Sequence, residues 1–128
     1  RSFTLTDGSG LSRDNRITCN ALISVLQRGS ATDVVGAAMA KAGDAGSTLD
    51  GKFEEPGLLG VLQAKTGSLR GVKALCGYFQ ASGGEVTFAL ILNGASAANF
   101  TGPWKRLGTV LLATAAAPSA TALAPRQS

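Results

Sequence analysis

The stretch Gln63-Ala64-Lys65-Thr66-Gly67-Ser68-Leu69 is the part of this sequence around which the rest is organised. It places a cation, two hydroxyl groups and a glycine side by side on what reads as a strand at the edge of a sheet. In an extended chain residues i and i+2 share a face, so Lys65 and Gly67 point one way and Thr66 and Ser68 the other. Because Gly67 has no Cβ, the backbone of a ligand can lie against the strand there. The stretch predicts an edge that binds an extended substrate with a terminal carboxylate. Lys-Thr-Gly alone also fits an ordinary surface strand.

Strands are predicted on both sides of a tight turn that follows this stretch. The first covers about 61–69 and the second about 72–81, after Arg70-Gly71. The hairpin signal Ser82-Gly83-Gly84 then leads into a third strand over 85–92. Apolar residues occupy both faces of this third strand: Val86, Phe88, Leu90 and Leu92 on one, Ala89 and Ile91 on the other. A strand buried on both faces lies inside a sheet with helices on each side, so the predicted fold class is α/β of the α+β type.

Helices are predicted before and after these strands. Thr18 is a suitable N-cap for a helix over about 19–28, and a second helix is expected from Thr32 or Asp33 to about Lys41. A last helix opens at Thr101-Gly102-Pro103 and carries an apolar stripe, in which Trp104 is interpreted as a core residue.

The remaining segments have weaker patterns. Residues 1–6 alternate apolar and polar side chains, which predicts a short strand. Residues 47–60 are irregular and are expected to form a loop. From about residue 116 the chain consists of Ala, Pro, Ser and Thr, which predicts a tail over 116–128 that buries little surface.

The composition excludes several classes of protein. The 128 residues are 45% hydrophobic and 16% charged with a net charge of +4, which fits one globular domain or a piece of one. The basic side chains are scattered, so a nucleic-acid surface is not expected. No apolar run is long enough to span a membrane. The sequence has no histidine, which removes Ser-His-Asp catalysis and most zinc sites, and neither a metal nor a cofactor is predicted.

The two cysteines, Cys19 and Cys76, are too few for a disulfide-built scaffold and too far apart in sequence for a metal clip. They could form a single bridge in an oxidising compartment, worth about 4 kcal/mol in the loop-entropy model. The alternative is two small buried hydrophobic residues. Counting free thiols under denaturing conditions distinguishes the two.

Two segments together resemble a known family. They are Asp7-Gly8-Ser9-Gly10-Leu11-Ser12-Arg13 and the segment from Ala64 to Val72, which contains Lys-Thr-Gly-Ser-Leu. Their order and separation resemble the C-terminal part of the D-alanyl-D-alanine carboxypeptidase/endopeptidases, the class C low-molecular-mass penicillin-binding proteins. The likeness covers roughly residues 4–112. It implies a penicillin-binding protein or serine β-lactamase-like transpeptidase fold, with an antiparallel sheet flanked by helices on both faces.

This family works with three sequence elements, Ser-x-x-Lys, Ser-x-Asn and Lys-Thr-Gly, and only the third occurs here. Ser12-Arg13-Asp14-Asn15 has the wrong spacing for the second. The family's missing elements lie upstream of the Asp-Gly-Ser-Gly segment. Residues 1–115 are therefore expected to be the C-terminal portion of the penicillin-binding domain, with the nucleophile on an upstream segment or a companion chain.

The resemblance also implies roles for individual residues. Lys65 would raise the local positive potential, and the backbone N–H of Ser68 would be one oxyanion donor. Thr66 and Ser68 would bind the substrate's terminal carboxylate, next to Gly67. Leu11, Arg13 and Leu69 match positions that face the peptide side chain of the substrate: the two leucines form an apolar wall, and the cation pairs with an acidic group. For Arg13 the alternatives are a solvated loop cation or a pair with Asp7 or Asp14.

The expected function is that of a penicillin-sensitive serine D,D-peptidase acting on peptidoglycan stem peptides and acylated by β-lactam antibiotics. Two alternatives stay open: a non-catalytic module that keeps the fold, and a related serine hydrolase such as a β-lactamase or esterase. The substrate implies a location outside the cytoplasmic membrane, in the periplasm or at the cell wall.

Overall fold

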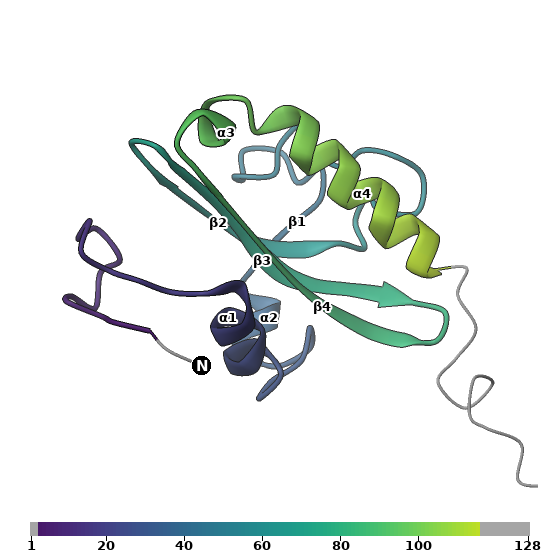
Figure 1. Ribbon diagram of the computed structural model, residues 1–128. Helices are drawn as coiled ribbons and strands as arrows, with labels where there is room; N and C mark the ends of the chain where they lie inside the picture. The colour runs from purple at the N-terminus through teal and green to yellow at the C-terminus, as the bar shows by residue number, and fades with distance from the viewer. Residues whose placement is uncertain (1–2, 116–128) are drawn as a thin grey trace, which may run out of the picture.

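The computed structural model describes residues 3–115, so the predicted tail at 116–128 lies outside the described residues. These residues form a four-stranded antiparallel sheet in the order β1-β2-β3-β4. The strands are β1 (Ala40–Lys41), β2 (Gln63–Leu69), β3 (Val72–Ala81) and β4 (Gly84–Asn93). The helices are α1 (Cys19–Leu26), α2 (Val34–Ala37), α3 (Ala95–Ala98) and α4 (Thr101–Ala115). Figure 1 shows α1 and α2 on one side of the sheet and α4 running diagonally across the other, which confirms the predicted fold class.

The β2–β3 hairpin holds the central sequence stretch in a fixed register. Leu69 lies opposite Val72 across the turn Arg70-Gly71, and the pairing continues without a break to Gln63 opposite Tyr78. Gly71 has a φ of +75°, in the left-handed region that glycine adopts without strain. Because the turn fixes the register, each side chain of β2 has a defined neighbour on β3.

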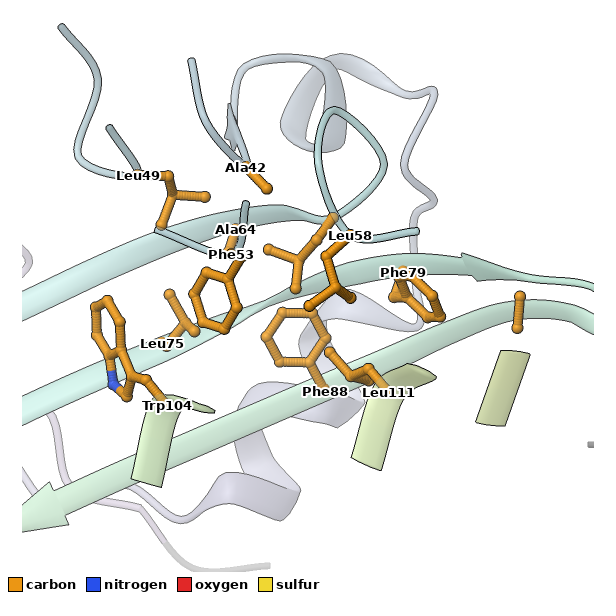
Figure 2. Packing of buried hydrophobic residues seen from close by; sticks show 12 residues of the cluster. Ala42, Leu49, Phe53, Leu58, Ala64, Leu75, Phe79, Phe88, Trp104 and Leu111 are labelled. Atoms are coloured by element: carbon orange, nitrogen blue, oxygen red, sulfur yellow. The ribbon is translucent and has the colours of Figure 1, made fainter. Parts of the chain in front are cut away.

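The main core lies between the sheet and α4 (Figure 2). Leu75 and Phe79 of β3 and Phe88 of β4 are buried against Trp104 and Leu111 of α4. The irregular segment between β1 and β2 closes the same core with further apolar side chains, including Leu49, Phe53 and Leu58. Trp104 is 7% exposed, as expected for a core residue.

Helix α1 covers the opposite face of the sheet. Its N-cap is Thr18, whose side chain accepts a hydrogen bond from the backbone N–H of Ala21, as predicted. At the other end, the buried hydroxyl of Tyr78 donates to the carbonyl of Leu26 at 2.6 Å. This bond satisfies a carbonyl at the end of the helix and ties α1 to β3.

Three sequence predictions are wrong. Residues 1–6 form no strand in the part that is described: Thr4 makes an isolated bridge with Arg16, and the flanking Phe3 and Leu5 are 59% and 60% exposed, so neither face is buried. The helix expected to reach Lys41 ends at Ala37, because Ala40 and Lys41 pair with β2 as β1. Within residues 3–115 the strand β4 is at the end of the sheet order rather than inside it, although helices do cover both of its faces.

Candidate functional site

The backbone of β2 has an open side over the Lys-Thr-Gly stretch. Strand β1 pairs only with Gln63 and Ala64 of β2, and Ala42 just beyond it donates its N–H to the carbonyl of Leu62 at 2.9 Å. Along a strand, the N–H and C=O of alternate residues point to the same side. The backbone groups of Thr66 and Ser68 therefore point to the side of β2 that has no strand partner within residues 3–115.

A side-chain contact agrees with this orientation. The ammonium group of Lys65 donates to the carbonyl oxygen of Thr66 at 2.6 Å, as expected for a carbonyl on the open side of β2. The exposed edge of β2 consequently offers the N–H groups of Thr66 and Ser68 as donors to an extended ligand.

The side chains of this strand divide between the two faces of the sheet, as predicted. Lys65 lies opposite Cys76, on the face covered by α1, whereas Thr66 lies opposite the buried Leu75, on the face covered by α4. Ser68 shares the α4 face with Thr66. The edge thus has a cation on one flank and two hydroxyls on the other.

The carboxylate of Asp7 organises the loop that carries Arg13. It accepts hydrogen bonds from the hydroxyl of Ser9 at 2.6 Å and from the side-chain amide of Asn15 at 2.8 Å. It also accepts from the backbone N–H groups of Gly10, Leu11 and Ser12. These bonds, led by those from Ser9 and Asn15, lower the pKa of Asp7 to about 2. This role of Asp7 was not predicted from the sequence, although an Asp ahead of a Gly-Ser-Gly turn is a known signal for it.

The loop and the sheet enclose a cavity of about 590 Å³. Arg13 on the loop and Leu69 at the end of β2, both predicted to contact substrate, line it together. The cavity lies on the face of Lys65, since Leu69 shares that face two residues on from Gly67. Its other walls include Leu5, Ile17, Val72 and Ile91, which the sequence analysis did not single out.

Leu11 does not line this cavity: its side chain is 69% exposed on the outside of the loop. Leu69, Val72 and Ile91 are among the apolar residues that line the cavity, and the contact of Leu11 with substrate stays a prediction. Arg13 is exposed at the cavity and has no ion pair within residues 3–115. The carboxylate of Asp7 is engaged by the loop instead. Of the alternatives left open for Arg13, the structure therefore shows an exposed loop cation rather than a pair with Asp7 or Asp14 within residues 3–115.

A second cavity of about 590 Å³ lies on the α4 side of the sheet. Phe53, Phe100 and Trp104 form its apolar part, and Lys52, Glu54, Glu55 and Lys105 add charged groups. The rings of Phe100 and Trp104 meet edge to face with their centroids 4.9 Å apart. No site was predicted at this position from the sequence.

Both cysteines are free thiols in the structure and both are half-buried. Burial raises the pKa of the Cys76 thiol, the positive charge of Lys65 lowers it in part, and the nearby Cys19 raises it. Lys65 acts on Cys76 because the two residues lie opposite each other on β2 and β3.

Two negative findings hold for the residues that the structure describes. They contain no group of three or more His, Cys, Asp or Glu side chains that could hold a metal ion. None of their helices has the length and apolar character needed to cross a membrane.

Comparison with known proteins places this chain in a family. Residues 1–115 match the model of the D-Ala-D-Ala carboxypeptidase 3 (S13) family. A D-alanyl-D-alanine carboxypeptidase from Actinomadura sp. (strain R39) is 39% identical over 101 residues, which are 73% of this chain and 19% of that protein. A penicillin-sensitive carboxypeptidase A from Dictyostelium discoideum is 33% identical over 108 residues, or 76% of this chain and 20% of the relative. The chain thus spans about a fifth of the length of the curated relatives that it matches.

Solved structures agree with this fold. Penicillin binding protein 4 from Haemophilus influenzae, complexed with a novel β-lactam, superposes with a TM-score of 0.61 at 34% identity, over 70% of this chain and 22% of that one. A predatory peptidoglycan endopeptidase from Bdellovibrio bacteriovorus gives a TM-score of 0.69 at 22% identity, over 88% of this chain and 32% of that one, which is a likeness of fold alone.

Proposed function

Because this chain belongs to the D-Ala-D-Ala carboxypeptidase 3 (S13) family, we propose that it supplies the Lys-Thr-Gly strand of a penicillin-sensitive serine D,D-peptidase. The resemblance stated from the sequence is confirmed at the level of the family. The proposed substrates are D-Ala-D-Ala termini or cross-linked peptides of peptidoglycan, which place the enzyme outside the cytoplasmic membrane. The proposed nucleophile is the serine of a Ser-x-x-Lys element on an upstream segment or a companion chain.

The open edge of β2 is the observation that carries this proposal. It offers backbone N–H groups, the Lys65 cation and two hydroxyls along one extended line, next to a cavity. A peptide that pairs with this edge would have its carbonyl near the N–H of Ser68 and its carboxyl terminus near the hydroxyls of Thr66 and Ser68. The substrate's reactive carbonyl would therefore lie at the backbone edge of β2, and its terminal carboxylate would lie on the face that carries the two hydroxyls.

The proposed chemistry is the one that the family resemblance implies, with this chain supplying an oxyanion donor. The serine Oγ adds to the carbonyl carbon between the two D-alanines, and its proton passes through the lysine of Ser-x-x-Lys to the leaving amine. The C–N bond breaks, the terminal D-alanine departs, and water then hydrolyses the ester. The N–H of Ser68 would stabilise the oxyanion, a contribution of about 3 kcal/mol to the barrier for one well-placed donor.

The cavity between the loop and the sheet is the proposed site for the peptide's side chain. Leu69 and Ile91 offer apolar walls, and Arg13 offers a cation at the rim that has no ion pair within residues 3–115. This arrangement suits a side chain with an aliphatic stem and an acidic end. We expect Arg13→Gln to raise the KM for such a peptide more than for one with a neutral end.

Labelling of the full-length protein with a fluorescent penicillin tests the proposal. The label is expected on a serine outside residues 1–128, located by denaturing gel and peptide mass spectrometry. Covalent label within residues 1–128 would mean that the nucleophile is misplaced. Absence of any label, together with no release of D-alanine from D-Ala-D-Ala peptides, would favour a non-catalytic module instead.

A further inference from the structure

Lys73 lies against the site on the face of the sheet opposite to Lys65. It stands across the β2–β3 hairpin from Ser68 and is half-buried. Its ammonium group donates a hydrogen bond to Ser68 Oγ at 2.8 Å and lies 4.8 Å from the centroid of the Phe100 ring. No carboxylate pairs with this ammonium within the described part of the chain. A half-buried cation held against the strand edge without a counter-anion is suited to an anionic ligand.

We propose that Lys73 is a positioning and specificity-determining residue for the terminal carboxylate of the substrate. It orients the hydroxyl of Ser68 and supplies positive charge on the flank of β2 where that carboxylate would lie. This inference rests on the proposed function, since it assumes that a peptide binds along the edge of β2.

The hydrogen-bond inventory of the Ser68–Lys73 pair supports this role. A serine hydroxyl has one hydrogen and two acceptor lone pairs, whereas an ammonium group has three hydrogens and no lone pair. Because Lys73 donates to Ser68 Oγ, the hydroxyl's own hydrogen is directed elsewhere and can be donated to a carboxylate. The ammonium keeps further hydrogens for the same ligand.

Neighbouring aromatic side chains keep the ammonium group of Lys73 ordered next to Ser68. The ring of Phe100 faces its ammonium, an arrangement that stabilises a cation without neutralising it. Phe100 is itself fixed by its edge-to-face contact with the buried Trp104 of α4. A side chain that is already ordered loses less conformational entropy when the ligand arrives.

The two lysines therefore have separable effects. Lys65 lies on the flank where the carbonyl would react, and Lys73 on the flank where the carboxylate would be recognised. Loss of Lys73 is expected to weaken substrates that end in a carboxylate, and to spare those in which the carboxylate is replaced by a neutral amide.

The test compares two peptides on the full-length enzyme, one ending in D-Ala-D-Ala carboxylate and one in the corresponding amide. For Lys73→Met we expect kcat/KM for the carboxylate peptide to fall about 10- to 100-fold, the range for losing a charge-assisted hydrogen bond. The amide peptide should change less than about threefold. Lys73→Arg should restore most of the activity on the carboxylate peptide, since it keeps the charge and the donors.

Two further variants make the readout specific. Arg106→Met removes one positive charge at an exposed position of α4 and should leave the preference for the carboxylate peptide unchanged. In a Ser68→Ala background, Lys73→Met should cause a smaller loss than in the native enzyme, because the two side chains act on one ligand group. Thermal melting of each variant reports whether it is folded.

Equal losses on both peptides, or losses that simply add in the double variant, would overturn the role assigned to Lys73 while leaving the proposed function in place. A native enzyme that takes no penicillin and cleaves neither peptide would overturn both.

Discussion

The contact between β2 and β3 at Gly77 makes a sharp prediction about the whole site. Gly77 is buried in β3 and lies opposite Ala64. A Cβ built there would lie 2.0 Å from the carbonyl oxygen of Gln63 and 2.8 Å from the Cα of Ala64, where ordinary contact begins at 3.4 Å. Both obstacles are backbone atoms, so a Gly77→Ala variant can be accommodated only if β2 moves away from β3 by more than an ångström.

The expected cost follows from two opposing terms. Inserting a methyl group into a close-packed region whose neighbours cannot rotate away costs about 3 kcal/mol. The lower conformational entropy of an unfolded chain with alanine in place of glycine returns about 0.7 kcal/mol. The steric term is larger, so Gly77→Ala should lower the free energy of unfolding by about 2 kcal/mol. Because β2 carries Lys65, its displacement should also slow the proposed acylation of the full-length protein by penicillin about 100-fold.

Gly67→Ala is the matched control on the neighbouring strand. Its added Cβ meets only the Cβ of Ala74, at an ordinary 3.5 Å. We expect denaturant unfolding of this variant to resemble that of the native protein, while turnover of D-Ala-D-Ala peptides falls because the methyl group occupies the ligand's side of the strand. If Gly77→Ala unfolds at the native denaturant concentration and labels at the native rate, the close approach of the two strands is wrong.

Three other measurements address single groups. Lys65→Ala should reduce penicillin acylation roughly 100-fold or more without altering the melting temperature, since its ammonium bonds only to an exposed carbonyl of its own strand; near-native acylation would refute its assigned role. The pKa of Asp7 is lowered from 3.8 to about 2, so the order it gives the loop should be complete above pH 3.8 and lost as the pH falls through about 2. NMR amide shifts of Ser12 should follow this titration in the native protein and not in Asp7→Asn, and a midpoint near pH 4 would contradict the bonding described. Because burial raises the pKa of Cys76 and Lys65 opposes that rise, alkylation of Cys76 at pH 8 should be slower than for an exposed thiol, and slower still in Lys65→Met; faster alkylation in that variant would be inconsistent with the electrostatics.

The strands and long helices could be predicted from the sequence because their signals are local. The turn at Arg70-Gly71 and the hairpin glycines delimit β3, and the apolar stripe after Thr101 delimits α4. The short elements could not be predicted in the same way. β1 exists because two residues pair with β2 more than twenty positions away, and nothing in their own composition distinguishes them from the end of a helix.

In the candidate site, too, features set by local sequence could be predicted and features set by long-range contacts could not. The motif gave the lysine, the hydroxyls and the alternation of faces, all of which follow from the extended backbone. The partners of these groups depend on tertiary contacts, as with Lys73 and Phe100, or with the walls that Leu5 and Ile17 give the cavity. One of them was within reach: the predicted turn places Leu69 opposite Val72, and the same count places Ser68 opposite Lys73.

The position of β4 has a practical consequence. Its ten residues have a strand neighbour on one side only within residues 3–115, and Glu85 is its one charged side chain. Because it contains no lysine or proline, this edge strand lacks the features that prevent β-sheet pairing between identical molecules. Material containing only these residues should therefore self-associate as its concentration rises. Replacing Thr87 with a charged residue should reduce this self-association.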